Sequence, residues 1–204
     1  MEIYTLFPDN FGSNCYILIS NHSAAVIDPS VDAEEIIKFV SEKGAKVEKI
    51  ILTHGHFDHV TSLDKLRDLT LAPAYIHKDD NEMLTDGEKN AHSIFFGYNK
   101  IWRPAETLLD DGNEIRLGDE VIKVVSTPGH SKGSICLICK DKLITGDTIF
   151  ANGYGRYDLH GGDVNALVSS LNSLRDLDQK LTIYPGHGDT ARLGSALDTI
   201  AYYI

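Results

Sequence analysis

Apolar residues along the chain fall into two patterns, short β-branched runs and longer stretches with the spacing of an amphipathic helix. A short apolar run that stops at Gly, Pro, Asn or Asp is typical of a buried strand. The stretch after Pro29 carries Asp32 and Glu34 in its first turns and stops at Gly44, which indicates a helix. These patterns predict helices near 32–43, 60–69 and 163–175 with a short closing helix, and strands near 2–7, 14–20, 23–28, 47–52, 73–76, 114–117, 120–126, 134–139, 142–146 and 181–184.

Two of the predicted hairpins resemble each other, and each ends in an aspartate. The first lies within 14–28 and closes on Asp28, and the second lies within 134–147 and closes on Asp147. Two βα-rich halves of this kind indicate two packed sheets with helices on their outer faces. No linker separates the halves and 42% of the residues are hydrophobic, so we expect a single α/β domain over residues 1–204.

A cluster of metal-ligand residues directly follows one short apolar run. Residues 53–59 read Thr-His-Gly-His-Phe-Asp-His, and neutral imidazoles and carboxylates are ligands that zinc and similar divalent ions prefer. On a helix, His54 and His56 would point about 200° apart, so we place them in a loop at the end of the strand. Asp58 and His59 then begin the next helix, where a carboxylate suits the N-terminal end. The alternative is a polar loop with incidental histidines.

Three further candidate ligands stand in turns after predicted strands. Each comes after an apolar run and directly follows a glycine; they are His130, Asp147 and His187. Any one of them is as easily an ordinary turn residue, but the three together with the 53–59 segment indicate a common site. Seven such groups are enough for two adjacent metal sites that each keep an open position for water, as catalytic rather than structural zinc sites do. The absence of cysteine from the set also argues against a structural zinc site.

This ligand pattern resembles that of the metallo-β-lactamase superfamily of binuclear metallohydrolases, and the match extends from Asp28 to His187. The resemblance implies a four-layer αββα sandwich of two mixed sheets with helices on the outer faces. It also implies a first metal held by His54, His56 and His130, and a second held by Asp58, His59 and His187. Asp147 stands where a carboxylate bridges both metals. Many true β-lactamases of this fold have a cysteine there or lack the carboxylate, so Asp147 points away from lactam hydrolysis.

The segments Gly146–Phe150 and Gly153–Arg156 resemble the glyoxalase II (hydroxyacylglutathione hydrolase) group and the related persulfide dioxygenases. Two departures concern glutathione. Only 17 residues follow His187, whereas glyoxalase II carries a C-terminal helical domain that supplies basic residues, and Asp158 stands where that group has a tyrosine contact. The resemblance therefore implies a short glyoxalase II-like hydrolase of a small S-acyl thiol, in which the use of glutathione itself is in doubt.

Two divalent ions held close together lower the pKa of a shared water, and the resulting hydroxide attacks a carbonyl carbon. A thiolate, whose conjugate acid has a pKa near ~8.5, leaves without a strong general acid, which suits a thioester. We expect Asp58 to orient the attacking hydroxide, and Asp28 and Thr53 to orient ligand histidines unless they only cap strand ends. Tyr154 and Arg156 are candidates to hold an anionic substrate; a solvated arginine in a turn is the alternative.

The rival hypothesis is a mononuclear iron persulfide dioxygenase of the same fold, which would use His54, His56 or its neighbours, His130 and Asp147. Nitrogen and oxygen ligands accept zinc, iron and manganese, and we expect two divalent ions, with zinc favoured. A metal analysis separates the two hypotheses, because one iron per chain would exclude the hydrolase. A binding module without catalysis is disfavoured, since seven ligands with open positions would be superfluous.

Composition narrows the choice of partner and compartment. A formal net charge of −11 disfavours nucleic acid, whose phosphates require a basic surface. No apolar stretch approaches the ~20 residues of a membrane span, and the first residues do not resemble a secretory signal. Three cysteines fit a reduced cytosol, so we expect a cytoplasmic enzyme with a small-molecule substrate and no membrane partner. Cys136 and Cys139 would face opposite sides of a strand and cannot pair.

The least periodic part of the chain is 78–107, and within it 92–104 gathers many aromatic residues. We expect these to pack over a sheet edge or to form a dimer contact, with a substrate-binding wall as the alternative. The remaining histidines match no ligand position and are expected at the surface or in the core; they are His22, His77, His92 and His160.

Overall fold

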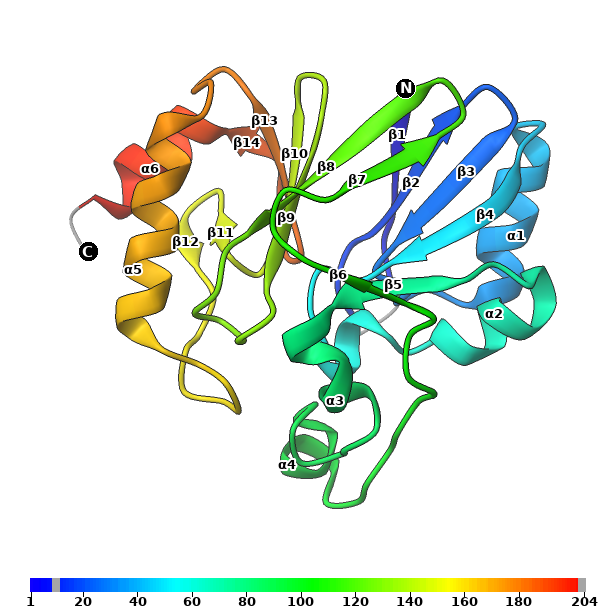
Figure 1. Ribbon diagram of the computed structural model, residues 1–204, viewed down its shortest axis with the longest axis horizontal. Coiled ribbons are helices and arrows are strands. Elements are labelled where there is room, and N and C mark those ends of the chain that lie inside the picture. Colours follow the sequence, from blue (N-terminus) through cyan, green and yellow to red (C-terminus); the bar gives the residue numbers. More distant parts are fainter. Residues whose placement is uncertain (9–11, 202–204) are drawn as a thin grey trace.

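The computed structural model describes residues 1–8 and 12–201 and contains two six-stranded sheets packed face to face (Figure 1). The first sheet has its strands in chain order: β1 (Glu2–Leu6), β2 (Cys15–Ser20), β3 (Ser23–Ile27), β4 (Lys46–Ile51), β5 (Ala74–His77) and β6 (Thr107–Leu109). The second sheet has the order β14 (Ala191–Arg192), β13 (Thr182–Pro185), β10 (Lys142–Gly146), β9 (Ile135–Cys139), β8 (Glu120–Ser126) and β7 (Glu114–Leu117). A small hairpin, β11 (Ile149–Phe150) and β12 (Gly153–Tyr154), follows β10.

Helices cover the outer face of each sheet. In Figure 1, α1 (Ala33–Glu42) and α2 (Leu63–Thr70) lie on the right, whereas α5 (Val164–Ser173) and α6 (Leu193–Ile200) lie on the left. Two shorter helices, α3 (Asn81–Leu84) and α4 (His92–Phe96), project at the lower end of the molecule. Three single-turn 3₁₀ helices span Phe57–His59, Lys78–Asp80 and Leu174–Asp176.

The alternation of side chains along the strands explains why the molecule has four layers. Cys15, Ile17 and Ile19 of β2 pack toward α1 and α2, while Tyr16 and Leu18 face the second sheet. Successive side chains of a strand point to opposite faces, so strands that are apolar on both faces must be covered on both. A third apolar cluster joins the second sheet to α5 and α6. This arrangement confirms the predicted αββα sandwich of two mixed sheets.

The carboxyl ends of several strands meet at one edge of each sheet. Strands β3, β4, β5 and β6 are parallel in the first sheet. In the second sheet β10 is parallel to β13, and β8 runs the same way because β8 and β10 are both antiparallel to β9. Loops that leave parallel strands at a common edge are where α/β proteins place their ligand sites.

Most predicted elements are confirmed, with differences in the irregular regions. The helix expected over 60–69 begins at Leu63, because Phe57–His59 forms a separate 3₁₀ turn that includes Asp58 and His59. The patterns missed α3, α4, β6, β14 and the two strands of the β11–β12 hairpin, each of which has five residues or fewer. The two cysteines of β9 are free and lie in different apolar clusters, as expected.

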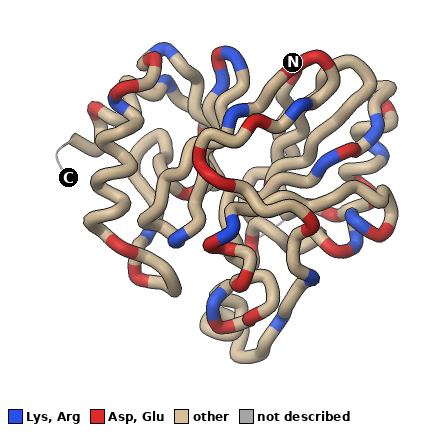
Figure 2. The backbone as a smooth tube through the Cα atoms, viewed as in Figure 1, with Lys and Arg blue, Asp and Glu red and all other residues tan. Residues whose placement is uncertain are grey.

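Charged residues of both signs are distributed along the backbone. In Figure 2, lysines and arginines are interspersed with acidic residues over both halves of the backbone. Among the described residues, no helix is both long and apolar enough to cross a membrane.

Candidate metal centre

The seven predicted ligand residues lie together at the edge where the strands end. They form three overlapping groups, in each of which the ligand atoms lie within 4.8 Å of one another. The groups are His54, His56 and His130; Asp58, His59 and His187; and His54, His59 and Asp147. The loops after β4, β8, β10 and β13 supply all of them, so both sheets contribute to one centre.

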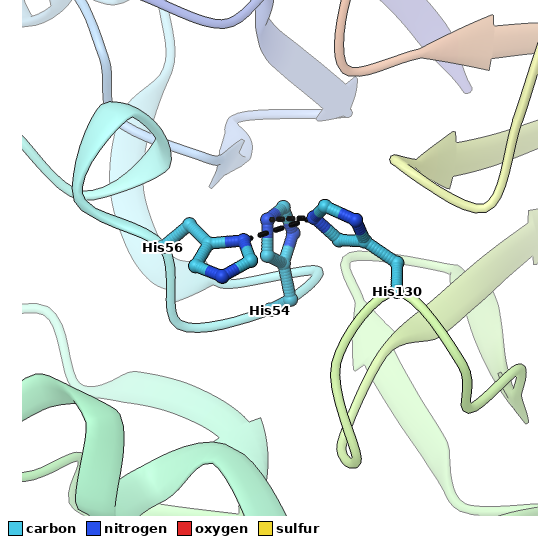
Figure 3. A group of neighbouring side chains, drawn as sticks. All are labelled: His54, His56 and His130. Carbon is cyan, nitrogen blue, oxygen red and sulfur yellow. Dashed lines mark hydrogen bonds between the residues drawn. The ribbon is translucent and has the colours of Figure 1, made fainter. Parts of the chain in front are cut away.

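In the first group three imidazoles point toward a common point (Figure 3). His130 Nε2 lies 2.9 Å from His56 Nδ1 and 3.2 Å from His54 Nε2. A proton on one nitrogen can form one hydrogen bond and leaves the other lone pairs facing each other. A divalent cation instead accepts all three lone pairs at once, which makes this group a candidate metal site.

In the second group two imidazoles approach one carboxylate. Asp58 Oδ2 lies 3.2 Å from His187 Nε2 and 3.8 Å from His59 Nε2. Asp147 connects the two groups, because its Oδ1 is 3.4 Å from His59 Nε2 and its Oδ2 is 3.6 Å from both His130 Nε2 and His187 Nε2. Oδ2 therefore lies near both groups, and Asp147 could contribute a ligand to each of them.

The hydrogen bonds around this centre leave lone pairs directed at it. His59 Nδ1 donates to Asp28 at 2.8 Å, and His130 Nδ1 donates to the Arg156 carbonyl at 2.6 Å. A histidine whose Nδ1 carries the proton presents a bare Nε2 to its surroundings. His59 Nε2 and Asp147 Oδ1 are fully buried without a hydrogen-bond partner. Buried polar atoms without a partner are costly, so this donor set fits a bound cation.

The pKa values of the ligands are consistent with that chemistry. Burial, reinforced by neighbouring imidazoles, lowers the pKa of His54 well below its usual value and that of His56 to about 3. Burial opposes the charged form of His59 as well, but the carboxylates of Asp147, Asp58 and Asp28 outweigh it and raise the His59 pKa well above its usual value. The first group therefore offers neutral imidazoles, whereas the second favours positive charge, which a proton or a divalent cation supplies.

Asp28 and Thr53 hold the ligand histidines in place, as the sequence indicated. The Asp28 carboxylate accepts hydrogen bonds from the Thr53 amide at 2.8 Å and the Thr53 hydroxyl at 2.6 Å, in addition to His59. Thr53 Oγ1 in turn accepts from His54 Nδ1 at 3.1 Å. The backbone of Asp28 is left-handed, with φ of 51°, an arrangement that costs free energy and is often found where function requires it.

Asp80 is a buried residue of the site that the sequence reasoning missed. Its carboxylate accepts from the Gly55 amide at 3.0 Å, the Ser131 hydroxyl at 2.6 Å and the Gly133 amide at 2.6 Å. Burial raises the Asp80 pKa, and these donors oppose that effect. Asp80 thus connects the loop of His54 and His56 to the loop of His130. An isolated aspartate in an irregular segment carries no sequence signal for this role.

Two glycines allow the loops to approach the ligands closely. A Cβ atom at Gly186 would lie 2.1 Å from Asp147 Oδ1, and one at Gly155 would lie 1.9 Å from the Asp147 carbonyl oxygen. Both distances are far below van der Waals contact, so a side chain at either position would displace Asp147.

A cavity of about 530 Å³ opens over the centre. Metal-ligand candidates form its floor, among them Asp58 and His187, and its walls are mainly apolar. Arg156 lines this cavity, whereas Tyr154 packs against the apolar cluster under α5 and α6 and is not among the lining residues. The structure therefore brings one of the two predicted substrate-contact residues to the cavity.

The aromatic stretch 92–104 divides between core and cavity. Trp102 is buried in the core next to the first sheet, while Phe95 and Phe96 line the cavity. Of the remaining histidines, His92 is buried among aromatic rings and His160 is exposed beside Glu82. His77 is buried, and His22 is exposed.

Comparisons with known proteins place the fold and the centre in a family. The family model that describes sequences of the metallo-beta-lactamase superfamily matches residues 8–187. The chain is 34% identical to the probable metallo-hydrolase YqgX of Bacillus subtilis (strain 168) over 179 residues, which cover 86% of this chain and 85% of that protein.

Two solved structures are also similar. One is the B3 metallo-beta-lactamase BLEG-1, with a TM-score of 0.91, 31% identity and coverage of 97% of both chains. The other is TTHA1623 in a di-iron-bound form, with a TM-score of 0.81, 30% identity and coverage of 95% of this chain and 98% of that one. The chain belongs to the metallo-beta-lactamase superfamily.

Proposed function

We propose that the chain is a binuclear metal-dependent hydrolase that cleaves a small thioester. The observation that carries the proposal is the convergence of seven histidine and aspartate side chains, several with unpartnered buried atoms, beside one cavity that five of them line. A concave site of this size with a few converging polar groups is typical of a small-molecule enzyme. Basic residues interspersed with acidic ones do not favour a polyanionic substrate.

The residues divide into two sites with a shared carboxylate. His54, His56 and His130 would hold one ion, Asp58, His59 and His187 would hold the other, and Asp147 would contact both. When bound, divalent ions lower the pKa of water and polarise a carbonyl group. Zinc is our first choice on ligand chemistry, and iron and manganese accept the same donors.

Asp58 would position the attacking water. Its carboxylate lines the cavity, and His187 fixes it from one side. Burial raises the Asp58 pKa, but His59 and His187 outweigh that effect and keep it below its usual value. Asp58 is therefore ionised at neutral pH, and it can accept a hydrogen bond from water and orient it toward a carbonyl carbon.

The same electrostatics favour a leaving group that departs as an anion. The lining carboxylates, Asp58 and Asp147, both have lowered pKa values and are poor proton donors at neutral pH. An amine requires protonation to leave, whereas a thiolate with a conjugate pKa near ~8.5 does not. This argument favours a thioester over an amide.

Hydrolysis of β-lactams is a second candidate, because the BLEG-1 structure aligns over 97% of the chain at 31% identity. The rival sulfur dioxygenase requires one iron per chain. Two complete ligand groups favour two metals instead, and TTHA1623 in its di-iron form is consistent with iron as the occupant.

The test is hydrolysis by the zinc-loaded chain of S-lactoylglutathione, an S-acyl N-acetylcysteamine and the β-lactam nitrocefin, with metal content measured on the same sample. We expect two metals per chain, release of thiol, and a fall of ~10²–10⁴-fold in kcat in Asp58→Asn. His54→Ala serves as the blank. Full thioester hydrolysis by Asp58→Asn, or lactam cleavage without thioester cleavage, would contradict the proposal, and one iron per chain would favour the dioxygenase.

A further inference from the structure

The cavity above the metal centre has walls made largely of phenylalanine. Phe57 comes from the turn that carries Asp58, Phe95 and Phe96 come from α4, and Phe150 comes from β11. The Phe57 ring centroid lies 5.4 Å from those of both Phe95 and Phe96. Leu159 completes the apolar wall. Rings at this spacing pack against one another and form a continuous aromatic wall, on which another flat ring can stack or meet an edge.

The positively charged side chain at the cavity, that of Arg156, already forms an ion pair with Asp158. Among the described residues that line the cavity, Arg156 is the only lysine or arginine. Asp158 accepts two hydrogen bonds from it, at 2.7 Å from Nε and 2.8 Å from the terminal nitrogen. This bidentate ion pair neutralises the guanidinium group, so Arg156 presents little free charge to an anionic substrate. Polar recognition is thus concentrated at the metal-binding floor.

The wall also leaves aromatic surface in contact with water. Phe95 is 53% exposed and Phe96 is 48% exposed, although both line a cavity next to the metal centre. Exposed apolar surface gathered around a concave site marks a place where a ligand is bound. A ligand group that covers these rings gains the free energy of apolar burial that the chain itself does not.

We propose that the acyl group of the substrate is uncharged and aromatic or bulky and apolar, and that Phe57, Phe95 and Phe150 enclose it. This inference rests on the proposed thioester hydrolysis and adds the substrate class. The scissile carbonyl then faces the ligand cluster, with the acyl group against the phenylalanine wall of the cavity. A small polar acyl group such as lactoyl covers this wall poorly.

The test compares acyl groups on one uncharged thiol. We would measure kcat/KM of the zinc-loaded chain for the acetyl, lactoyl and phenylacetyl thioesters of N-acetylcysteamine. We expect phenylacetyl to exceed acetyl by about tenfold or more, and Phe95→Ala to remove most of that preference. The matched control is Ile94→Ala, a neighbour on α4 that is 62% exposed and outside the cavity lining, and it should keep the preference. Equal rates for the acyl groups, or a preference unchanged in Phe95→Ala, would overturn the inference.

A binding measurement separates this inference from the proposed reaction. Calorimetric titration of the zinc-loaded chain with phenylacetate and with acetate compares two ligands that share a carboxylate and differ in the ring. We expect phenylacetate to bind about tenfold more tightly, and Phe95→Ala to lose the difference. If no thioester is cleaved but this difference is found, the proposed reaction fails and the apolar ligand class stands. Equal affinities would overturn the ligand class whatever the reaction.

Discussion

The metal-binding loops and the aromatic segment Ala91–Ile101 border the same cavity but differ in how firmly they are held. His54 and His59 are 1% and 0% exposed, and hydrogen bonds fix the far nitrogen of each ring. In the aromatic segment, Phe95, Tyr98 and Ile101 are more than half exposed. The metal-binding loops are therefore fixed by buried hydrogen bonds, while the aromatic segment is open to solvent.

This difference separates two tasks. A ligand sphere must be held to within fractions of an ångström, which explains the buried hydrogen bonds behind each histidine. A wall that recognises an apolar group needs surface and shape, and it can change residue by residue without disturbing the floor. We therefore expect substitutions in the two regions to affect different measurements.

The largest expected effect is the gain in thermal stability when zinc binds. With free zinc at 100 to 1,000 times its dissociation constant, binding to the folded state adds about 2.7–4.1 kcal/mol to the free energy of unfolding. For a chain of this size that corresponds to a rise in Tm of about 5–15 °C in a thermal melt. His56→Ala should lose most of this rise, because it removes one of three converging imidazoles.

The control for this experiment comes from the other region. Phe95→Ala should show the same metal-dependent rise in Tm as the unchanged chain, since Phe95 contributes no ligand. If Phe95→Ala lost the rise, the metal-binding loops and the aromatic segment would be one cooperative unit rather than two separable regions.

A smaller effect is expected from Asp80→Asn, which acts on the floor through its support. Asp80 now accepts hydrogen bonds from the Gly55 and Gly133 amides and the Ser131 hydroxyl. In the asparagine variant, an NH₂ group would face some of these donors in place of a carboxylate oxygen. We expect zinc affinity, measured by competition with a chelating dye, to fall by about 10–100-fold. The ratio of phenylacetyl to acetyl kcat/KM should not change.

The matched control is Asp79→Asn, at the adjacent position of the same 3₁₀ turn. Its carboxylate is partly exposed and 3.7 Å from Lys132 Nζ, so the substitution should leave zinc affinity unchanged. Equal losses in both variants would mean that the turn is merely disturbed and that Asp80 does not position the ligand loops.

The same contrast explains what could be predicted from the sequence. His54, His56 and Asp58 were identified because metal ligands follow strands at short, distinctive spacings, and the two hairpins ending at Asp28 and Asp147 indicated the two sheets. These features are local in the chain.

Features that depend on tertiary contacts were not predicted. The role of Asp80 arises only where the loops after β4, β5 and β8 meet. Tyr154 was expected at the substrate, but it packs against the apolar cluster under α5 and α6 and does not line the cavity. Short elements such as α4 have too few residues for a periodic pattern to emerge.

The smallest expected effect is a change in substrate preference when the ion pair between Arg156 and Asp158 is broken. Arg156→Ala would also change the cavity shape, so the sharper change is Asp158→Asn, which keeps the size of the side chain and removes its charge. Hydrogen bonding to Arg156 lowers the Asp158 pKa, so the pair is charged at neutral pH. Freed from its carboxylate, Arg156 should attract an anionic substrate, and kcat/KM for S-lactoylglutathione relative to phenylacetyl N-acetylcysteamine should rise about two- to fivefold, the scale of an exposed ion pair. The gain should shrink at high salt, because screening weakens exposed charges. An unchanged ratio at low salt would mean that Arg156 does not face the substrate, and the selectivity of the wall would then rest on its phenylalanines alone.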